Sequence, residues 1–138
     1  PVGLRSEDEI LAMLGLSALA ERPAADVTPS QQRLLEIGMA LGTRPRLLLL
    51  DEVAAGLTEA EVDDMAQRIR RLRDDWGLTV VWIEHAVTTL LKYVERVLVL
   101  HQGRKIADAT PAEVVRNKEV IEAYLGDEMA ATSEGATA

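Results

Sequence analysis

Apolar runs that end abruptly in charged residues mark the predicted strands of this chain. Four consecutive leucines, Leu47–Leu50, are followed directly by Asp51-Glu52. A second, largely apolar run, residues 78–83, ends in Glu84-His85, and a third strand is expected over residues 96–100, which are apolar after Arg96. Uninterrupted runs of this length are typical of strands that are covered on both sides of a sheet. The pattern therefore predicts three strands, the first two of them buried on both faces.

Capping residues predict two helices before the first strand. Ser6 and Glu9 have the spacing of a capping box, in which each side chain accepts a hydrogen bond from the other residue's backbone. Ser30 is expected to cap a second helix over residues 31–41. Gly42 is expected to end that helix in the left-handed conformation.

A longer helix is predicted between the first two strands. Thr58 and Glu61 form another capping box, and Gly77 is expected to end the helix that they begin. Its apolar residues have the spacing of a helix with one buried face: Val62, Met65, Ala66, Ile69, Leu72 and Trp76.

Shorter elements are predicted after the second strand. Residues 86–94 are expected to be helical, and Gln102-Gly103 predicts a turn into a return strand around residues 105–107. Thr110, followed by proline, is expected to begin one or two short helices. Residues 127–138 are expected to form a disordered tail.

The order strand, helix, strand, helix, strand is the pattern of a parallel α/β sheet with right-handed crossovers. Ligands of such sheets bind beyond the carboxyl ends of the strands. Asp51-Glu52 and Glu84-His85 both stand at such ends. We therefore expect these four side chains to converge on one crevice.

Composition narrows the classes of function. The chain has 138 residues, about one domain, and its 48% of hydrophobic residues is typical of globular proteins. Its net charge of −8 disfavours binding to nucleic acid or anionic lipid by charge alone. The absence of cysteine excludes disulfides, thiolate catalysis and cysteine-ligated metal sites. We expect neither a membrane-spanning segment nor a signal peptide, because the apolar runs are short.

The first strand and the two acids after it have the pattern of a Walker B motif. The strand fixes both carboxylates, the aspartate oxygens suit Mg²⁺, and the glutamate is placed to orient or deprotonate an attacking water. Asp51-Glu52 taken alone is equally typical of an ordinary acidic turn. His85 taken alone is a common polar strand end. Their occurrence at two successive strand ends favours a functional site.

The loop that enters the second helix is a further candidate. Residues 27–33 have the sequence Val-Thr-Pro-Ser-Gln-Gln-Arg. Backbone N–H groups at a helix N-terminus attract phosphate, and the helix dipole adds to this attraction. An ordinary serine cap explains the same residues in isolation.

Taken in order, these motifs resemble the C-terminal half of an ABC-type ATP-binding subunit, most closely those of bacterial branched-chain amino-acid importers. The matching segments are 27–31 at the signature, 44–52 at the Walker B motif, 54–57 at the D-loop, 83–85 at the switch-histidine loop, and 103–107, 110–113 and 120–126 at the ending of the subgroup. The resemblance extends from about residue 6 to residue 126. It implies an α/β fold, a partial P-loop NTPase-like parallel sheet with flanking helices that lacks the N-terminal P-loop part.

The resemblance implies a role for each residue at the strand ends. Asp51 would serve Mg²⁺, and Glu52 would act as the catalytic base toward water. His85 would contact the γ-phosphate of ATP and sense its departure.

The resemblance also implies a second ATP-binding subunit, because the family sandwiches two ATP molecules in a head-to-tail dimer. The residues that would face the nucleotide of the opposite subunit are Thr28, Ser30 and Gln31. Those that would line the dimer seam are Ala54, Ala55, Gly56 and Leu57. Transmembrane permease subunits are the other implied partners, and the cytoplasmic, inner face of the cell membrane is the implied location.

A P-loop is missing from the chain. Such a loop needs two glycines five positions apart, followed by Lys and by Ser or Thr. No two glycines of this chain are five positions apart, and no Gly-Lys dipeptide occurs. We therefore expect that the chain alone neither binds ATP tightly nor hydrolyses it. Because it begins with Pro1 rather than Met, we also expect it to be a piece of a longer polypeptide.

The signature loop departs from the family pattern. Pro29 removes one N–H donor, and Ser30 adds a Cβ where close approach of a phosphate favours glycine. We expect these changes to weaken the contact with the nucleotide of a second subunit.

Two functions from different classes remain open at this point. In the first, residues 1–126 are the C-terminal portion of an ATPase domain, with a helical and signature part over 1–45 and a part over 46–126 that runs from Walker B to the C-terminal helices. In the second, the chain is a non-catalytic, degenerate interaction module, which the altered Pro29-Ser30 supports. In either case we expect an incomplete sheet with an open apolar surface, through which the isolated chain self-associates.

Overall fold

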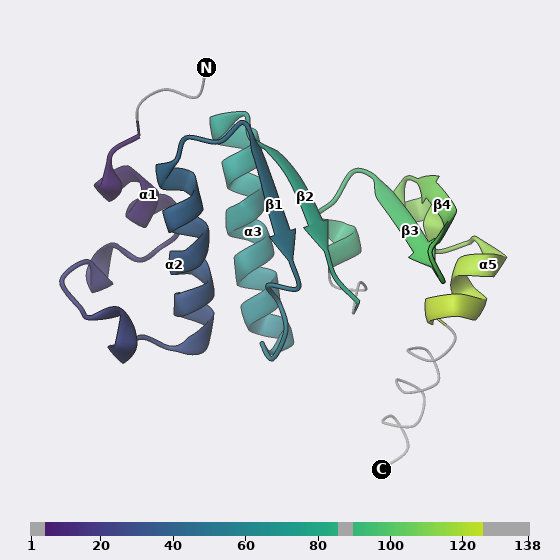
Figure 1. Ribbon diagram of the computed structural model, residues 1–138, viewed down its shortest axis with the longest axis horizontal. Coiled ribbons are helices and arrows are strands. Elements are labelled where there is room, and N and C mark those ends of the chain that lie inside the picture. The colour runs from purple at the N-terminus through teal and green to yellow at the C-terminus, as the bar shows by residue number, and fades with distance from the viewer. Residues whose placement is uncertain (1–4, 86–89, 126–138) are drawn as a thin grey trace, which may run out of the picture. The chain divides into compact units, whose positions relative to one another are not determined.

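A computed structural model of the chain describes residues 5–85 and 90–125 (Figure 1). The chain divides into two compact units, residues 1–90 and residues 91–138. The expected tail over 127–138 and the first part of the expected helix over 86–94 lie outside the described residues. Within that expected helix, Leu90–Lys92 form a single 3₁₀ turn.

Helix α1, Glu7–Met13, begins with the predicted capping box. The Ser6 Oγ accepts a hydrogen bond from the Glu9 N–H at 3.2 Å, and the Glu9 carboxylate accepts one from the Ser6 N–H at 2.8 Å. Two 3₁₀ turns, Ser17–Leu19 and Ala24–Asp26, then lead to the second helix. The predicted start of α1 at Ser6 is confirmed.

Helix α2, Pro29–Gly42, begins earlier than predicted. Its cap is Thr28, whose Oγ1 accepts from the Gln31 N–H at 3.3 Å while the Gln31 side chain accepts from the Thr28 N–H at 3.0 Å. The prediction of Ser30 as the cap is wrong, because a proline at the first helical position has its φ already set and needs no N–H partner. Ser30 is therefore inside the first turn.

The end of α2 also differs from the prediction. Gly42 is the last helical residue rather than a left-handed terminator. The left-handed residue is Arg44, with φ of 58°, whose N–H bonds to the Leu41 carbonyl at 2.9 Å. It stands directly before Pro45, which disfavours the right-handed helical conformation in the residue that precedes it.

Strands β1, Leu47–Asp51, and β2, Thr79–Ile83, pair in parallel (Figure 1). Helix α3, Glu59–Trp76, connects them, as the sequence predicts. Thr58 and Glu61 form its capping box, and Gly77, with φ of 66°, ends it. Parallel strands must be joined by a long crossover, usually a helix, and α3 is that crossover.

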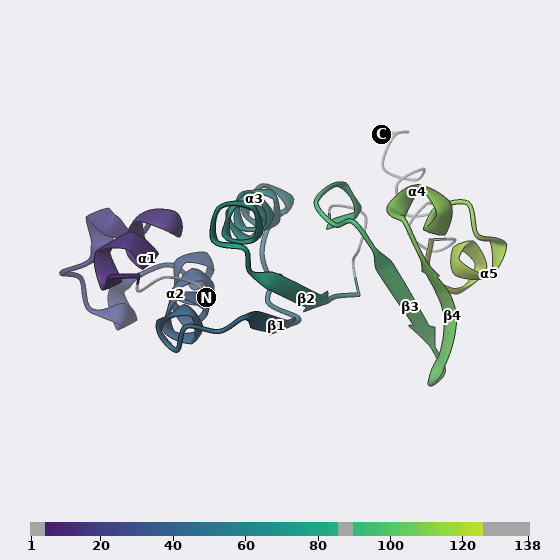
Figure 2. The same cartoon turned by 90° about the horizontal axis from the view of Figure 1, so that it is seen from above.

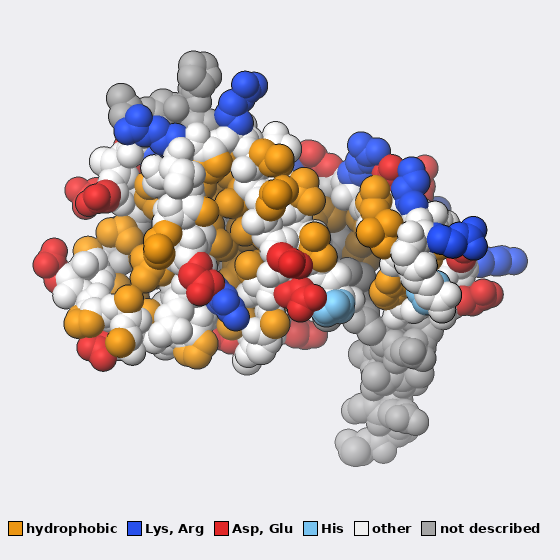
Figure 3. Space-filling view, viewed as in Figure 1, with side chains coloured by type: hydrophobic (Ala, Val, Ile, Leu, Met, Phe, Trp, Pro, Cys, Tyr) orange, Lys and Arg blue, Asp and Glu red, His pale blue; other side chains and the backbone are white. Residues whose placement is uncertain are grey.

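The two strands are buried on one face only, which corrects the prediction of burial on both. Leu48 and Leu50 are almost fully buried, whereas Leu47 and Leu49 are 50% and 68% exposed. The helices of this unit pack on a single face, so the alternating side chains of the strands point to opposite environments. Four exposed apolar residues of β1 and β2 make up what we call the open sheet face: Leu47, Leu49, Val81 and Ile83 (Figure 3).

The core of the first unit lies between the sheet and helices α1 to α3 (Figure 2). Its most enclosed side chains are Leu14, Met65 and Leu72. The other buried members are Ile10, Leu16, Leu34, Ile37, Leu41, Leu48, Leu50, Ile69 and Leu78. Burial of a leucine-sized side chain contributes about 1.5–3 kcal/mol, so this cluster is the main source of stability of the unit.

The second unit contains a β-hairpin. Strand β3, Val97–His101, pairs antiparallel with β4, Arg104–Ala109. The turn residues Gln102 and Gly103 both have positive φ, 48° and 75°, as a tight two-residue hairpin turn requires. The predicted return strand is thus confirmed.

The hydrogen-bonded strand pairs each lie within one unit. Strand β1 pairs with β2 in the first unit, and β3 pairs with β4 in the second. The two-residue turn brings β4 directly alongside β3. That the third strand continues the parallel sheet stays a prediction.

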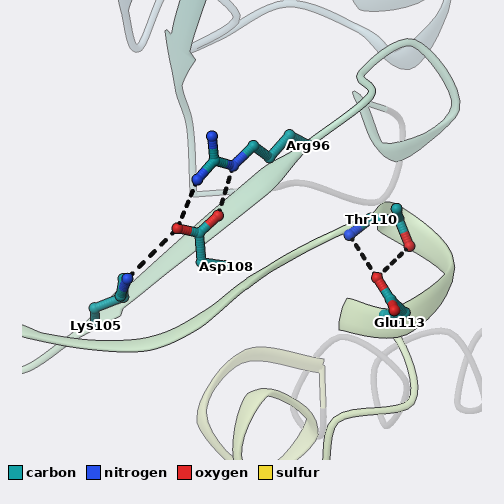
Figure 4. A network of polar contacts seen from close by, with 5 residues as sticks. All are labelled: Arg96, Lys105, Asp108, Thr110 and Glu113. Atoms are coloured by element: carbon teal, nitrogen blue, oxygen red, sulfur yellow. Dashed lines mark hydrogen bonds and ion pairs between the residues drawn. The ribbon is translucent and has the colours of Figure 1, made fainter.

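Short helical elements close the second unit. Helix α4, Pro111–Val114, is followed by α5, Lys118–Val120, and by a π-helical turn over Ile121–Leu125. The predicted start at Thr110 is confirmed, since its N–H and its hydroxyl both donate to the Glu113 carboxylate, at 2.9 and 2.7 Å (Figure 4). Val114 and Val120 form a small buried cluster against the hairpin. In the described part of the chain, no helix combines the length and the hydropathy needed to cross a bilayer.

A pair of charges links the start and the end of the hairpin. The Arg96 guanidinium donates two hydrogen bonds to Asp108, at 2.7 and 2.9 Å, and the Lys105 Nζ lies 3.5 Å from the same carboxylate (Figure 4). The hydrogen bonds from Arg96, and to a smaller degree the charges of Arg96 and Lys105, lower the pKa of Asp108. A carboxyl with a lowered folded-state pKa stabilises the fold above its unfolded pKa of about 4, and this contribution is lost as the pH falls through the folded value.

We therefore expect Asp108→Asn to lower the melting temperature of the second unit at pH 7 and to have no effect near pH 2. Thermal unfolding at the two pH values, followed by hairpin amide signals, measures this difference. Asp26→Asn, at an exposed position in the other unit, is the control. An equal loss at both pH values would show that the charge of Asp108 contributes nothing.

Candidate functional site

The carboxyl end of the parallel pair brings together residues that the sequence singles out. The Glu52 N–H donates to the Ile83 carbonyl at 2.9 Å, which extends the ladder one residue beyond β1. The His85 Nε2 lies 2.8 Å from the Glu52 Oε1. The expected convergence of the two strand ends is therefore observed for Glu52 and His85, and the pair is open to solvent, with side chains 49% and 79% exposed.

Glu52 is held in a strained backbone conformation. Its φ is 51°, in the left-handed region that residues with a Cβ rarely adopt. This conformation costs about 1–2 kcal/mol for an L-residue. Such strain persists only where surrounding contacts fix the chain, and it is frequent at functional sites. The backbone thus turns sharply at the residue that carries the exposed carboxylate.

Asp51 is the last residue of β1 and stands opposite Ile83 in the register. It is exposed at the same strand end as Glu52. Among residues 5–85 and 90–125, no group of three His, Cys, Asp or Glu side chains is arranged to hold a metal ion. Mg²⁺, however, is commonly held by one or two protein carboxylates together with the phosphates of a nucleotide. Asp51 fits that kind of site.

The segment after Glu52 is a compact turn. The Ala55 N–H donates to the Glu52 carbonyl at 3.2 Å, and the Leu57 N–H donates to the Ala54 carbonyl at 3.1 Å. Gly56 has φ of 77°, and an added Cβ there would meet open space, so the conformation rather than crowding favours glycine. Leu57 packs against the core and ties the turn to the unit.

The predicted signature residues lie at the start of α2. The Thr28 and Ser30 hydroxyl oxygens are 3.1 Å apart, and Gln31 completes the capping box. Glu61, at the start of α3, faces this loop: the Thr58 N–H, then the hydroxyls of Thr58 and Ser30, lower the pKa of Glu61. The structure therefore groups Thr28, Ser30 and Gln31 with one another and with α3.

A pocket of about 290 Å³ lies beside this loop. Ser30 and Gln31 line it from α2, Glu61 and Arg68 from α3.

One residue, Glu84, was placed at the strand ends from the sequence but was given no role there. Glu84 accepts hydrogen bonds from the Ala54 N–H and from the Trp82 indole, each at 2.9 Å. The signal was available, because residues two apart in a strand share a face, and Trp82 and Glu84 are two apart. The contact with Ala54 depends on the tertiary pairing of the strands.

Comparison with known proteins decides the relationship of this fold and site. The high-affinity branched-chain amino acid transport ATP-binding protein BraF of Pseudomonas aeruginosa is 41% identical over 117 residues, 85% of this chain and 46% of BraF. The high-affinity branched-chain amino acid transport ATP-binding protein LivG of Escherichia coli is 37% identical over 117 residues, 85% of this chain and 46% of LivG. The chain is homologous to the C-terminal portion of ABC transporter ATP-binding subunits.

A family model and solved structures agree with this assignment. The model described as branched-chain amino acid ATP-binding cassette transporter matches residues 104–130. The ADP conformation of MJ1267, an ATP-binding cassette of an ABC transporter, superposes with a TM-score of 0.79 at 31% identity, over 87% of this chain and 48% of MJ1267. Both the resemblance and the predicted ABC-type fold class are confirmed. The ABC-type portion seen here spans about half the length of the relatives that it matches.

The left-handed conformation of Glu52 in this ABC-type portion predicts a stability difference between two substitutions. Glu52→Gly relieves the positive φ, whereas Glu52→Ala keeps the strain, and both remove the contact with His85. We expect the glycine variant to be more stable by about 1 kcal/mol. Urea unfolding of the two variants measures the difference. Equal stabilities would show that the turn relaxes without cost.

Proposed function

We propose that this chain is the C-terminal portion of an ATP-binding, ATP-hydrolysing subunit of an ABC importer, with branched-chain amino acids or related small solutes as cargo. The observation that carries the proposal is the pairing of the Glu52 carboxylate with the His85 imidazole at 2.8 Å, at the ends of two parallel strands. The fold does not need this exposed pair, since the core lies on the other face of the sheet, against the helices. BraF and LivG, named as branched-chain amino acid transport proteins, support the class of cargo.

The residues at the strand ends divide the chemistry among them. Glu52 accepts a proton from the attacking water, and His85 holds the Glu52 carboxylate and contacts the γ-phosphate. Asp51, exposed beside them, would hold Mg²⁺. When bound, the metal ion neutralises charge on the phosphates. No covalent intermediate on the protein is needed, because phosphoryl transfer to water depends on positioning and charge stabilisation.

Two further loops serve a second subunit. Thr28, Ser30 and Gln31, at the N-terminus of α2, face the nucleotide of the partner, where backbone N–H groups and the helix dipole favour phosphate. The turn over Ala54, Ala55, Gly56 and Leu57 lines the seam between subunits. Because Ser30 interacts with Glu61 within its own chain, we expect its contact with the partner's nucleotide to be weak. Permease subunits and the inner face of the cell membrane complete the proposed setting.

Hydrolysis requires a P-loop, which this sequence lacks. The test therefore uses the chain expressed behind a segment that supplies the glycine-rich loop. In that protein we expect Glu52→Gln to keep ATP binding and to lower the rate of phosphate release by about 10²–10⁴-fold, the usual contribution of a general base. Binding is measured by equilibrium titration and turnover by phosphate release.

Glu119→Gln, an exposed position on α5, is the matched control and is expected to hydrolyse ATP at the unsubstituted rate. Unchanged turnover in Glu52→Gln would remove Glu52 from the base role. A protein that carries all of these residues and a P-loop, yet shows no hydrolysis, would favour the non-catalytic interaction module instead.

The open sheet face predicts how the isolated chain behaves. Leu47, Leu49, Val81 and Ile83 are each about half or more exposed and adjacent in the sheet register. Adjacent exposed apolar residues of this kind mark an association surface. We expect the 138-residue chain to self-associate through this face and Leu49→Lys to reduce the association.

Light scattering and binding of a hydrophobic dye measure the association. Met39→Lys is the matched control, because Met39 is 71% exposed on α2 and lies outside the open sheet face. A compact monomer that binds no dye contradicts the proposal, and so does an equal effect of the two lysine variants.

A further inference from the structure

We propose that Glu84 is a positioning residue that fixes the turn after Glu52 against the end of β2 and thereby sets Glu52 relative to His85. The inference rests on the function proposed above, because it concerns the same site. Glu84 stands between Ile83, the last residue of β2, and His85.

A single carboxylate oxygen makes both contacts of Glu84. Its Oε1 accepts from the Ala54 backbone N–H and from the Trp82 Nε1–H, each at 2.9 Å. Both hydrogen bonds are partly buried, and Trp82 itself packs against the core. Charge-assisted hydrogen bonds shielded from water are stronger than exposed ones, so this oxygen holds the turn to a rigid part of the unit.

Three consecutive residues at the end of β2 each hold one group of the turn. The Ile83 carbonyl accepts the Glu52 N–H, the Glu84 carboxylate accepts the Ala54 N–H, and His85 contacts the Glu52 carboxylate. The first two contacts are placed two residues apart along the turn, on either side of Val53. They fix the backbone on both sides of Val53 and thereby hold Glu52 in its left-handed conformation.

The contacts also distinguish the positioning role of Glu84 from a direct part in ATP hydrolysis. The oxygen of Glu84 that reaches the turn already accepts two N–H groups, whereas the Glu52 carboxylate is 49% exposed and contacts His85. Glu84 therefore acts through Glu52. Loss of the Ala54 bond frees the segment that holds the candidate base and the D-loop.

Three variants separate the contacts. Glu84→Gln keeps a carbonyl oxygen able to accept both hydrogen bonds, and Glu84→Ala removes the acceptor. Trp82→Phe removes the indole donor and leaves the Ala54 bond. Because Trp76 and Trp82 are the two tryptophans of the chain, the Trp76 indole signal is an internal reference.

The first measurement is amide hydrogen exchange by NMR on the full 138-residue chain. In Glu84→Ala we expect the Ala54 and Glu52 amides to exchange about tenfold faster, with core amides of α3 unchanged. Glu84→Gln restores slow exchange, and Trp82→Phe leaves the Ala54 amide protected. The proposal is overturned if Glu84→Ala leaves Ala54 protected, or if Trp82→Phe exposes it equally.

The second measurement is ATP hydrolysis by the protein that also carries a P-loop. We expect Glu84→Ala to lower kcat about tenfold or more with KM for ATP nearly unchanged, and Glu84→Gln to restore kcat. If Glu84→Ala lowers the melting temperature together with kcat, and Glu84→Gln restores neither, then Glu84 is a merely structural residue and the proposal is overturned. Absence of hydrolysis in the unsubstituted protein overturns the proposed ATPase function, while the exchange measurement still decides whether Glu84 fixes the turn.

Discussion

Five residues of β1 lie in parallel register with five residues of β2, and this register fixes where the chain leaves each strand. Asp51 stands opposite Ile83, so the next residues of both strands emerge at the same edge. A shift by one residue would turn Leu48 and Leu50 away from the core and separate Glu52 from His85. Burial of the two leucines thus holds the register, and the register holds the site. The site depends on the core beneath it, although no catalytic candidate is part of that core.

The positive φ of Glu52 has a different origin from that of the other two non-glycine residues with positive φ among the described residues. Arg44 is left-handed at a helix end and Gln102 in a hairpin turn, both positions where this conformation is ordinary. Glu52 follows a buried strand directly, and its neighbours in β2 restrain it. The sharp turn leaves the Glu52 carboxylate beside His85, two residues beyond the end of β2. Backbone strain is therefore coupled to side-chain placement at this one point.

The elements that could be predicted from the sequence are those decided within a few residues. The capping boxes at Ser6 and Thr58 and the hairpin turn at Gln102 need no distant partner. The approximate strand limits, and the convergence of the strand ends that brings Glu52 near His85, followed from strand-end chemistry and parallel topology. Glu84 illustrates what did not follow, because its value as an acceptor depends on a backbone N–H thirty positions earlier in the chain.

The error about the burial of the strands has the same physical source. Leu47 and Leu49 are as apolar as Leu48 and Leu50, so their exposure depends on which layers cover the sheet rather than on their own chemistry. Ser30 was misplaced for a local reason: two hydroxyl residues flank Pro29, and the proline selects the earlier one as the cap.

The same four-residue device begins four helices of this chain. Boxes at Ser6, Thr28, Thr58 and Thr110 each pair a hydroxyl residue with a Glu or Gln three positions later. Each closes within a single turn, so it lowers the cost of nucleation before any long-range contact exists. The β1–β2 pairing, by contrast, joins residues about thirty positions apart and must wait for α3. As the chain emerges during synthesis, the helix starts at Ser6, Thr28 and Thr58 can therefore form before β2 is available, and the site between Glu52 and His85 only after it.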